Sequence, residues 1–394
     1  MRRTRNSRSA RLRFAALATA LALGAALGAC SPGAPSAPSP GTSGDEADPQ
    51  DGAASPAPLP SGELVSASPD DLRLGVAVAG GGHHLETGLG SGTALADETY
   101  ASLVAENFTS LSPENQLKWE WLRPERETFD FAAADELVAF AQEHGLAVRG
   151  HTLFWHSQNP AWLTSGELDD DELREVLREH VETVVGRYAG QIEQWDVANE
   201  IFDDQARLRT RDNPFLGRFG VEIVADVFRW AHEADPEALL FLNDYAIESI
   251  GPKSDAYFEL VQELLADGVP VHGMGFQGHL SMKYPKPGDM RENLERFAEL
   301  GLEVAVTEAD VRMAVEDGVA SPEDLAAQAG YYEVMLDACL EVDSCRSFTV
   351  WGLSDAFSWV PFFFAGEGAA TLLDEEYRVK PAYVALVDRL ATGR

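Results

Sequence analysis

The chain has 394 residues and is strongly acidic, with 65 Asp and Glu against 30 Lys and Arg and a formal net charge of −35. A negative charge of this size argues against binding to nucleic acid and against adhesion to anionic surfaces by charge. It is typical of a well-solvated exported protein, which is the interpretation we favour. Adaptation to a salty environment stays open as the alternative.

Residues 1–29 have the pattern of a signal peptide. Arginines between Arg2 and Arg13 precede an apolar stretch from Phe14 to Ala29. The stretch is too short and too rich in alanine for a membrane span. It ends in Leu27-Gly28-Ala29-Cys30, which resembles a bacterial lipobox, and that resemblance implies lipidation of Cys30. The alternative is ordinary cleavage near Ala29, with Cys30 incidental.

Residues 30–70 are expected to tether this anchor to the folded domain at residues 71–394. From Ser31 to about Ser68 the chain is dense in Pro, Ser, Gly and Ala. Such a composition cannot bury enough apolar surface to order itself, which predicts a flexible linker. We therefore expect an exported cell-surface lipoprotein that meets the membrane only through its N-terminal lipid. Secretion without an anchor is the alternative.

Two further cysteines form a candidate disulfide. With Cys30 assigned to the anchor, Cys339 and Cys345 remain as an even pair. An oxidising compartment makes a disulfide the expected state of such a pair. It would fix the turn between a helix and the strand that holds Phe348. Two buried free thiols are the alternative.

The domain alternates strand-like and helix-like segments. Short apolar runs predict eight strands, over Leu72–Ala79, Phe108–Pro113, Ala147–Trp155, Ile192–Asn199, Ala238–Asp244, Gly273–Leu280, Glu303–Glu308 and Phe348–Leu353. Amphipathic stretches predict helices over Ala132–Glu143, Asp169–Tyr188, Val221–Glu233, Ser254–Ala266 and Glu323–Leu340. This alternation indicates a parallel sheet, and eight units favour a single (β/α)₈ TIM barrel.

An open, doubly wound sheet is the structural alternative. It usually carries a glycine-rich phosphate loop after its first strand. Gly80-Gly81-Gly82 follows the first predicted strand, but no G-x-G-x-x-G helix opening is present. We therefore interpret the three glycines as a loop.

Two of the predicted strands end in glutamate, Glu200 and Glu308. Two carboxylates that face one pocket can break a glycosidic bond, one as proton donor and the other as nucleophile or base. Strand ends meet at one rim of a barrel, and the other ends carry amides, imidazoles and tryptophans. Sugars present hydroxyls at their edges and C–H groups on their faces, so this mixture predicts a sugar-binding site.

Six segments then resemble family 10 glycoside hydrolases, the β-1,4-xylanases, in order over roughly Leu72 to Leu390. They are Pro113-Glu114-Asn115-x-x-Lys118-Trp119, Gly150-His151-Thr152-Leu153-Phe154-Trp155-His156-Ser157-Gln158, Trp195-Asp196-Val197-Ala198-Asn199-Glu200, Gly275-Phe276-Gln277-Gly278-His279-Leu280, Val306-Thr307-Glu308 and Thr349-Val350-Trp351-Gly352. The resemblance implies a TIM barrel, a retaining glycosidase, and catalysis without a metal or organic cofactor.

The resemblance also implies roles for individual residues. Glu200 would be the acid/base and Glu308 the nucleophile, with His279 and Asp310 holding the nucleophile and Asn199 contacting the 2-hydroxyl of the reacting sugar. The other implied substrate contacts are Glu114, Asn115, Lys118, His151, Gln158 and Gln277 on the non-reducing side, Tyr245 after the fifth strand, and the walls Trp155, Trp351 and Trp359.

Other residues of the same types are expected to play no part in the site. Trp119, Trp195 and Trp230 are expected to pack in the core, and His144, His180 and His232 to lie at the surface. His83 and His84 follow the first strand, but no third ligand is evident, so we expect no metal there.

One loop departs from the family pattern. Val360 stands where the family usually has arginine, and Pro361 and three phenylalanines follow it. We expect this apolar loop to reshape the acceptor side of the site or to dock another surface.

Together these features predict a monomeric, retaining endo-1,4-β-xylanase that acts on xylan or xylo-oligosaccharide. Two alternatives stay open, a mixed-specificity β-1,4-glycanase and a non-catalytic xylan-binding lipoprotein. A scaffold that interacts through Phe362–Phe364 is a third and weaker one.

Overall fold

A computed structural model describes residues 59–85, 89 and 92–393. The expected signal peptide, Cys30 and most of the expected linker lie outside these described residues. Among the helices of this part of the chain, none combines the length and the apolar character that crossing a membrane requires.

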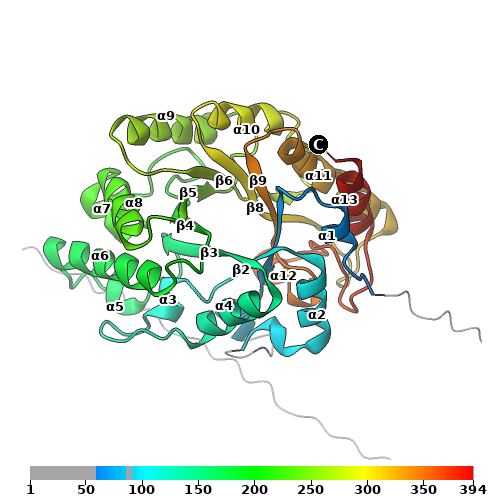
Figure 1. Ribbon diagram of the computed structural model, residues 1–394, viewed down its shortest axis with the longest axis horizontal. Coiled ribbons are helices and arrows are strands. Elements are labelled where there is room, and N and C mark those ends of the chain that lie inside the picture. The colour runs from blue at the N-terminus through cyan, green and yellow to red at the C-terminus, as the bar shows by residue number, and fades with distance from the viewer. Residues whose placement is uncertain (1–58, 86–88, 90–91, 394) are drawn as a thin grey trace, which may run out of the picture. The chain divides into compact units, whose positions relative to one another are not determined.

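Eight parallel strands close into a barrel (Figure 1). They are β1 Arg73–Val78, β2 Ser110–Pro113, β3 Ala147–Phe154, β4 Gln194–Asn199, β5 Leu239–Asp244, β6 Gly273–Phe276, β8 Glu303–Ala314 and β9 Cys345–Val350. Because β9 pairs with both β1 and β8, the sheet has no free edge in this barrel. The predicted TIM barrel is confirmed.

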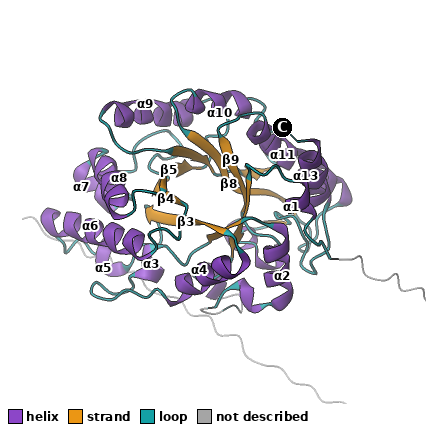
Figure 2. Cartoon of the chain, viewed as in Figure 1, coloured by secondary structure: helices purple, strands orange, loops and turns teal. Residues whose placement is uncertain are grey.

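Helices surround the barrel strands (Figure 2). They are α1 Glu63–Ala67, α2 Glu98–Asn107, α3 Trp119–Leu122, α4 Ala132–His144, α5 Ala161–Thr164, α6 Asp170–Arg187, α7 Pro214–Phe219, α8 Glu222–Ala234, α9 Pro252–Ala266, α10 Met290–Ala298, α11 Pro322–Leu340, α12 Val360–Phe363 and α13 Pro381–Thr392. The predicted helices are all present, with ends displaced by one or two residues.

Local sequence explains where the longest helices begin. Asp169 accepts a hydrogen bond from the backbone N–H of Glu172, whose side chain accepts one from the backbone of Asp169, so α6 starts with a capping box. Ser321 caps α11 through the backbone N–H of Asp324, and Pro322 occupies the first turn, where its missing N–H costs nothing.

Large and small side chains alternate inside the barrel. A Cβ at Gly150 of β3 would lie 2.3 Å from the ring of Trp195 on β4. Trp195 and Trp119 are buried and Trp230 packs against the core, as predicted. His180 was wrongly expected at the surface. It is fully buried on α6, and its ring stacks on Trp119 with 3.6 Å between ring centroids.

The limits of five predicted strands are shifted by one or two residues, and three predicted strands differ more. The segment Gly273–Leu280 divides into β6 and β7 His279–Ser281, because Gly278 adopts a φ of 79° between them. Strand β8 continues past Glu308 to Ala314, where β7 and β10 Glu367–Gly368 pair with it. Strand β9 starts at Cys345 and ends at Val350 instead of spanning Phe348–Leu353.

The expected end of the linker at residue 70 is too late. Helix α1 precedes that point, and its Leu64 is only 2% exposed. The hydroxyl of Tyr383 on α13 lies 3.0 Å from Glu63 Oε2 and 2.8 Å from Asn107 Oδ1, so its one hydrogen is shared between these two acceptors. One buried leucine and this polar contact tie the segment to the domain, although its composition resembles that of the linker.

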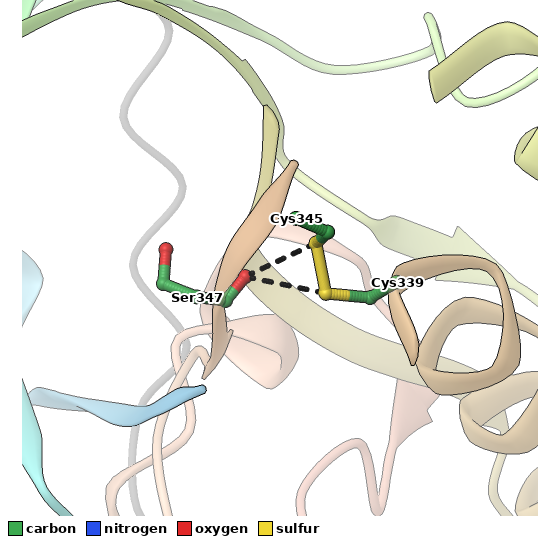
Figure 3. Close-up of a disulfide and its surroundings, with 3 residues drawn as sticks. All are labelled: Cys339, Cys345 and Ser347. Atoms are coloured by element: carbon green, nitrogen blue, oxygen red, sulfur yellow. Dashed lines mark hydrogen bonds between the residues drawn. A yellow bond between two sulfur atoms is a disulfide. The ribbon is translucent and has the colours of Figure 1, made fainter. Parts of the chain in front are cut away.

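The predicted disulfide between Cys339 and Cys345 is present (Figure 3). It joins the last turn of α11 to the first residue of β9, with 5.2 Å between the Cα atoms. Both sulfurs are buried and lie 3.7 and 3.8 Å from the carbonyl oxygen of Ser347. The bond therefore fixes the turn that leads into β9.

We expect reduction of this disulfide to lower the free energy of unfolding by about 2 kcal/mol, because the closed loop is short and restricts the unfolded chain only modestly. Denaturant unfolding with and without a phosphine reductant measures the change. The Cys339→Ala/Cys345→Ala variant is the control, since the reductant should not affect it. Equal stability of the oxidised and reduced wild-type protein would contradict the prediction.

Candidate active site

Glu308, on β8, is a buried carboxylate surrounded by donors. Asn243 Nδ2 donates to its Oε1 at 2.6 Å, and His279 Nε2 donates to its Oε2 at 3.1 Å. His151 Nδ1 lies 3.7 Å from Oε1. Burial raises the pKa of Glu308, but the charge of His151 and the hydrogen bonds from His279 and Asn243 outweigh burial and lower the pKa to about 2. Glu308 is therefore an anion at neutral pH.

Asn243 reaches Glu308 because its neighbour on β6 has no side chain. A Cβ at Gly275 would lie 2.3 Å from Asn243 Oδ1 and 2.9 Å from Thr307 Cγ2. Thr307 Oγ1 donates to Asn243 Oδ1 at 2.7 Å, which turns the amide nitrogen toward the carboxylate. Asn243 was not among the predicted site residues. The sequence feature that could have identified Asn243 is its amide side chain at the end of a predicted strand. In the structure Asn243 is directly paired with Asn199 on β4.

Glu200 follows the end of β4 and is the more open of the two carboxylates, with 12% of its side chain exposed against 5% for Glu308. Gln277 Nε2 and Asn199 Nδ2 donate to its Oε1 at 3.1 and 3.3 Å. His156 Nδ1 lies 3.7 Å from its Oε2. The backbone of Glu200 has a φ of 53°, in the left-handed region, which residues other than glycine adopt mainly at constrained sites.

A chain of amides connects the two carboxylates. Asn199 Oδ1 accepts from Asn243 Nδ2 at 2.9 Å and from Gln277 Nε2 at 3.2 Å. Each of these two nitrogens has a second hydrogen, which Asn243 donates to Glu308 and Gln277 donates to Glu200. The positions of both glutamates are therefore set by one uncharged network.

His279 carries a positive charge next to Glu308. Its Nδ1 lies 3.0 Å from Asp310 Oδ2, and Trp359 Nε1 donates to that same oxygen at 2.7 Å. Burial lowers the pKa of His279, but Asp310 and Glu308 outweigh burial and raise it to about 10. The predicted partners of Glu308 are thus brought together, because β7 pairs with β8 in the register that places His279 opposite Asp310.

A second buried ion pair supports His151. His151 Nδ1 lies 3.0 Å from Asp196 Oδ2, and the Arg149 guanidinium donates to both oxygens of Asp196. Arg149 also donates to Gln194 at 2.7 Å. Arg149 and Asp196 were not predicted. The sequence feature that could have identified them is Arg149, an arginine inside an apolar strand. A buried charge requires a partner, so a carboxylate such as Asp196 was to be expected nearby.

The residues after β2 form a third polar group. Asn115 Nδ2 donates to the Gly80 carbonyl at 3.0 Å, and Asn115 Oδ1 accepts from Lys118 at 3.2 Å and from Gln158 at 3.0 Å. The Lys118 ammonium lies 4.6 Å from the ring centroid of Trp155. Burial lowers the pKa of Lys118, while Glu114, Glu308 and Glu200 act in the opposite direction.

Aromatic rings complete the site. The ring of Trp351 lies 5.2 Å from that of His151 and 6.0 Å from that of His279, and the ring of Trp359 lies 5.0 Å from that of His279. Tyr245 is placed differently. Its hydroxyl donates to Asp204 at 2.6 Å and accepts from Arg209 at 2.9 Å, so its polar contacts are with the loop after β4 and not with the two glutamates.

The apolar loop after Trp359 lies beside the first strand end. The rings of Phe362 and Phe363 lie 5.2 and 5.6 Å from that of His83, next to Glu114, and both phenylalanines are exposed. The loop therefore lies beside residues that the resemblance assigns to the non-reducing side, and not with the acceptor side that it was expected to reshape. The alternative expectation, that it docks another surface, stays a prediction.

Among the described residues, two groups of side chains have the geometry to hold a metal ion, His151–Asp196–Glu308 and His83–His84–Glu114. In the first, Arg149 already neutralises Asp196, and hydrogen bonds from Asn243 and His279 satisfy Glu308. That group is explained without an ion.

A closed barrel that presents two carboxylates among amides, imidazoles and indoles at its strand ends defines a carbohydrate-processing enzyme of the TIM-barrel class. The sequence profile of glycosyl hydrolase family 10 matches residues 75–389. The chain belongs to this family.

Several relatives of known activity are similar to the chain. Endo-1,4-beta-xylanase B of Thermotoga neapolitana is 39% identical over 289 residues, covering 73% of this chain and 82% of that protein. The beta-1,4-xylanase of Dictyoglomus thermophilum is 39% identical over 297 residues, covering 73% and 84%. The crystal structure of xylanase 10B from Thermotoga petrophila RKU-1 in complex with xylobiose superposes with a TM-score of 0.76 at 37% identity, covering 84% of this chain and 96% of that one.

We expect His279→Gln to raise the pKa of Glu308 by roughly one unit or more, because glutamine keeps a hydrogen-bond donor but removes the positive charge. A ¹³C NMR titration of the glutamate carboxyl carbons measures the shift, with Glu308→Gln to assign the signal. The exposed His144→Gln on α4 is the matched control and should leave the titration unchanged. An unaltered Glu308 pKa in His279→Gln would overturn this account.

Proposed function

We propose that this protein is a retaining endo-1,4-β-xylanase, which hydrolyses internal bonds of xylan through a covalent glycosyl-enzyme intermediate. The observation that carries the proposal is the asymmetry of the two carboxylates. A charged histidine and an amide hold Glu308 as an anion, whereas Glu200 is more open and accepts hydrogen bonds only from amides. The relatives are xylanases and a similar structure is a complex with xylobiose, and both support the same substrate class.

Glu308 acts as the nucleophile. Its anionic carboxylate attacks the anomeric carbon and forms the glycosyl ester, while Glu200 protonates the departing glycosidic oxygen. Asn243 and His279 hold the Glu308 oxygens in place. A positioned carboxylate needs no further reorganisation when the sugar arrives, which lowers the barrier to attack.

Glu200 then acts as the base in the second step. Esterification removes the negative charge of Glu308 from the neighbourhood of Glu200, and this favours the ionised form of Glu200 that deprotonates the attacking water. Asn199 donates to Glu200 and accepts from both flanking amides. In this mechanism Asn199 contacts the 2-hydroxyl of the reacting sugar. Such a contact contributes most in the transition state.

The remaining polar and aromatic groups bind the polymer. Glu114, Asn115, Lys118, Gln158 and Gln277 supply hydrogen-bond donors and acceptors for sugar hydroxyls. Trp155, Trp351 and Trp359 supply flat surfaces for C–H faces. A mixed-specificity β-1,4-glycanase would use the same groups. A non-catalytic xylan-binding protein is less well supported, because binding alone would not require a buried anion held by dedicated donors.

The protein acts as a monomer at the cell surface, held by a lipid on Cys30 and reached by xylan or xylo-oligosaccharide outside the membrane. The lipobox-like sequence and the Pro- and Ser-rich segment after it support this location. Secretion after ordinary cleavage is the alternative.

Glu308→Ala and Glu200→Ala should each lower xylan turnover on the order of 10³-fold or more, since each removes one of the two groups that act in both chemical steps. Azide should restore turnover of an activated aryl xylobioside in Glu200→Ala and yield a β-glycosyl azide. Reducing-sugar release and NMR of the product measure these outcomes. The exposed Glu237→Gln is the control and should behave as the wild-type protein.

Two results would contradict this assignment. Xylan turnover near the wild-type rate in either alanine variant would show that the substituted glutamate does not have the role assigned to it. Equal kcat/KM on aryl xylobioside and aryl cellobioside would favour the mixed-specificity alternative over a xylanase.

Cys30→Ser should move the protein from the membrane fraction to the soluble fraction when it is expressed in a bacterium with its own leader, because serine cannot carry the thioether-linked lipid. Immunoblots of the two fractions and incorporation of labelled fatty acid measure the change. Xylanase activity per molecule should stay the same. A wild-type protein that incorporates no fatty acid would establish the secreted alternative.

A further inference from the structure

His83, His84 and Glu114 meet where two barrel strands end. The histidines lie in the short 3-10 helix Gly82–Leu85 after β1, and Glu114 directly follows β2. The strands are parallel neighbours, and the backbone N–H of Glu114 donates to the Val78 carbonyl at 3.1 Å. One ligand atom from each of the three side chains lies within 4.8 Å of the others. No third ligand was evident in the sequence next to His83 and His84. The structure supplies one, the carboxylate of Glu114 after the neighbouring strand.

The His83 ring is buried but poorly paired. Its side chain is 5% exposed, and its Nε2 has no hydrogen-bond partner among the described residues. Its Nδ1 lies 3.9 Å from Glu114 Oε1, which is longer than a hydrogen bond. A buried polar atom without a partner costs free energy, so such groups are few in folded proteins. The rings of Phe362 and Phe363 pack beside His83 and supply no polar partner.

The donor set and its spacing suit a transition metal. Two imidazoles and one carboxylate, with a fourth position left open, are a common set for Zn²⁺. Tetrahedral ligands at zinc-bond length stand about 3.3–3.6 Å apart. His84 Nε2 lies 3.0 Å from Glu114 Oε2 and His83 Nδ1 lies 3.9 Å from the other carboxylate oxygen, Oε1, and one ligand atom from each of the three side chains lies within 4.8 Å of the others. An ion would replace the proton that His84 and Glu114 share, so only small side-chain shifts are needed.

Nearby charge limits the affinity. The Lys118 ammonium acts on both Glu114 and His83, and it opposes a second cation. Asn115 also donates to Glu114 Oε1 at 3.3 Å and would compete for that oxygen. We therefore expect micromolar rather than nanomolar binding.

We propose that His83, His84 and Glu114 bind a divalent transition-metal ion, with Zn²⁺ as the best match, and that the bound ion inhibits the enzyme by occupying Glu114. The inhibition rests on the proposed function, in which Glu114 contacts sugar, whereas the binding of the ion does not. Because the ion lies at a substrate-binding carboxylate and not at Glu200 or Glu308, it should compete with substrate and leave the chemical steps intact. The inhibited enzyme then shows a raised KM and an unchanged kcat.

Direct binding is tested first, on the full folded chain after treatment with a chelator and desalting. Calorimetry with ZnCl₂ should show one site, and Co²⁺ should give visible absorption bands of a low-coordinate site that Zn²⁺ abolishes. His83→Gln should weaken Zn²⁺ binding tenfold or more, while the exposed His144→Gln should bind as the wild-type protein. Near-UV circular dichroism verifies that both variants are folded. No saturable binding, or equal binding in His83→Gln, would overturn the site.

Kinetics then test the consequence. With an aryl xylobioside, Zn²⁺ should raise the wild-type KM several-fold at constant kcat, and it should have no effect on His83→Gln, whose metal-free kinetics should match those of the wild type. A fall in kcat without a change in KM would instead place the ion at His151–Asp196–Glu308 and overturn the proposal. If the metal-free protein hydrolyses no xyloside, the proposed function is wrong. The calorimetric test of the metal site does not depend on that result.

Discussion

One chain of amide hydrogen bonds, from Asn243 through Asn199 to Gln277, is the interaction on which the rest of the site depends. Each of the outer amides, Asn243 and Gln277, divides its two hydrogens between Asn199 and one of the two carboxylates, so neither outer amide has an unused donor. Because amides carry no net charge, they position both glutamates without placing a charge beside either of them. The charge that distinguishes the two comes from elsewhere, chiefly from His279 and His151 next to Glu308.

This network exists only because three strands keep their register. Asn199 on β4 is directly paired with Asn243 on β5, and Asn243 with Gly275 on β6. A shift of one residue would turn the inward side chains outward, and the amides would lose contact. Gly275 adds a steric condition, since any Cβ there would occupy the place of the Asn243 amide. Packing inside the barrel and the ionisation of Glu308 are therefore linked through Gly275.

The sequence predicted the strands and their polar ends because period, composition and strand-end chemistry are local properties. It missed what depends on partners across strands. Asn243, Arg149 and Asp196 gained their roles only from neighbours that lie far away in the chain, and His180 was misplaced because a histidine in an otherwise charged helix gives no sign of the aromatic rings that cover it. The start of the domain was also missed, since a single buried leucine is a weak signal within a Pro- and Ser-rich segment.

Glu114 and Glu308 are two buried carboxylates that are kept ionised by different neighbours, and the neighbours decide whether a cation could bind beside each one. Around Glu308 the hydrogen-bond donors are the Asn243 amide and His279, which is itself paired with Asp310, and the nearby His151 is paired with Asp196. Around Glu114 the same task falls to His84 and Lys118, with His83 beside them, and burial is again outweighed, so its pKa is lowered. In the proposed function Glu114 accepts sugar hydroxyls, so it has to keep free lone pairs, and imidazoles next to free lone pairs also suit a cation. On both proposals the Lys118 ammonium shifts the balance from metal ion toward sugar, because its charge opposes a second cation.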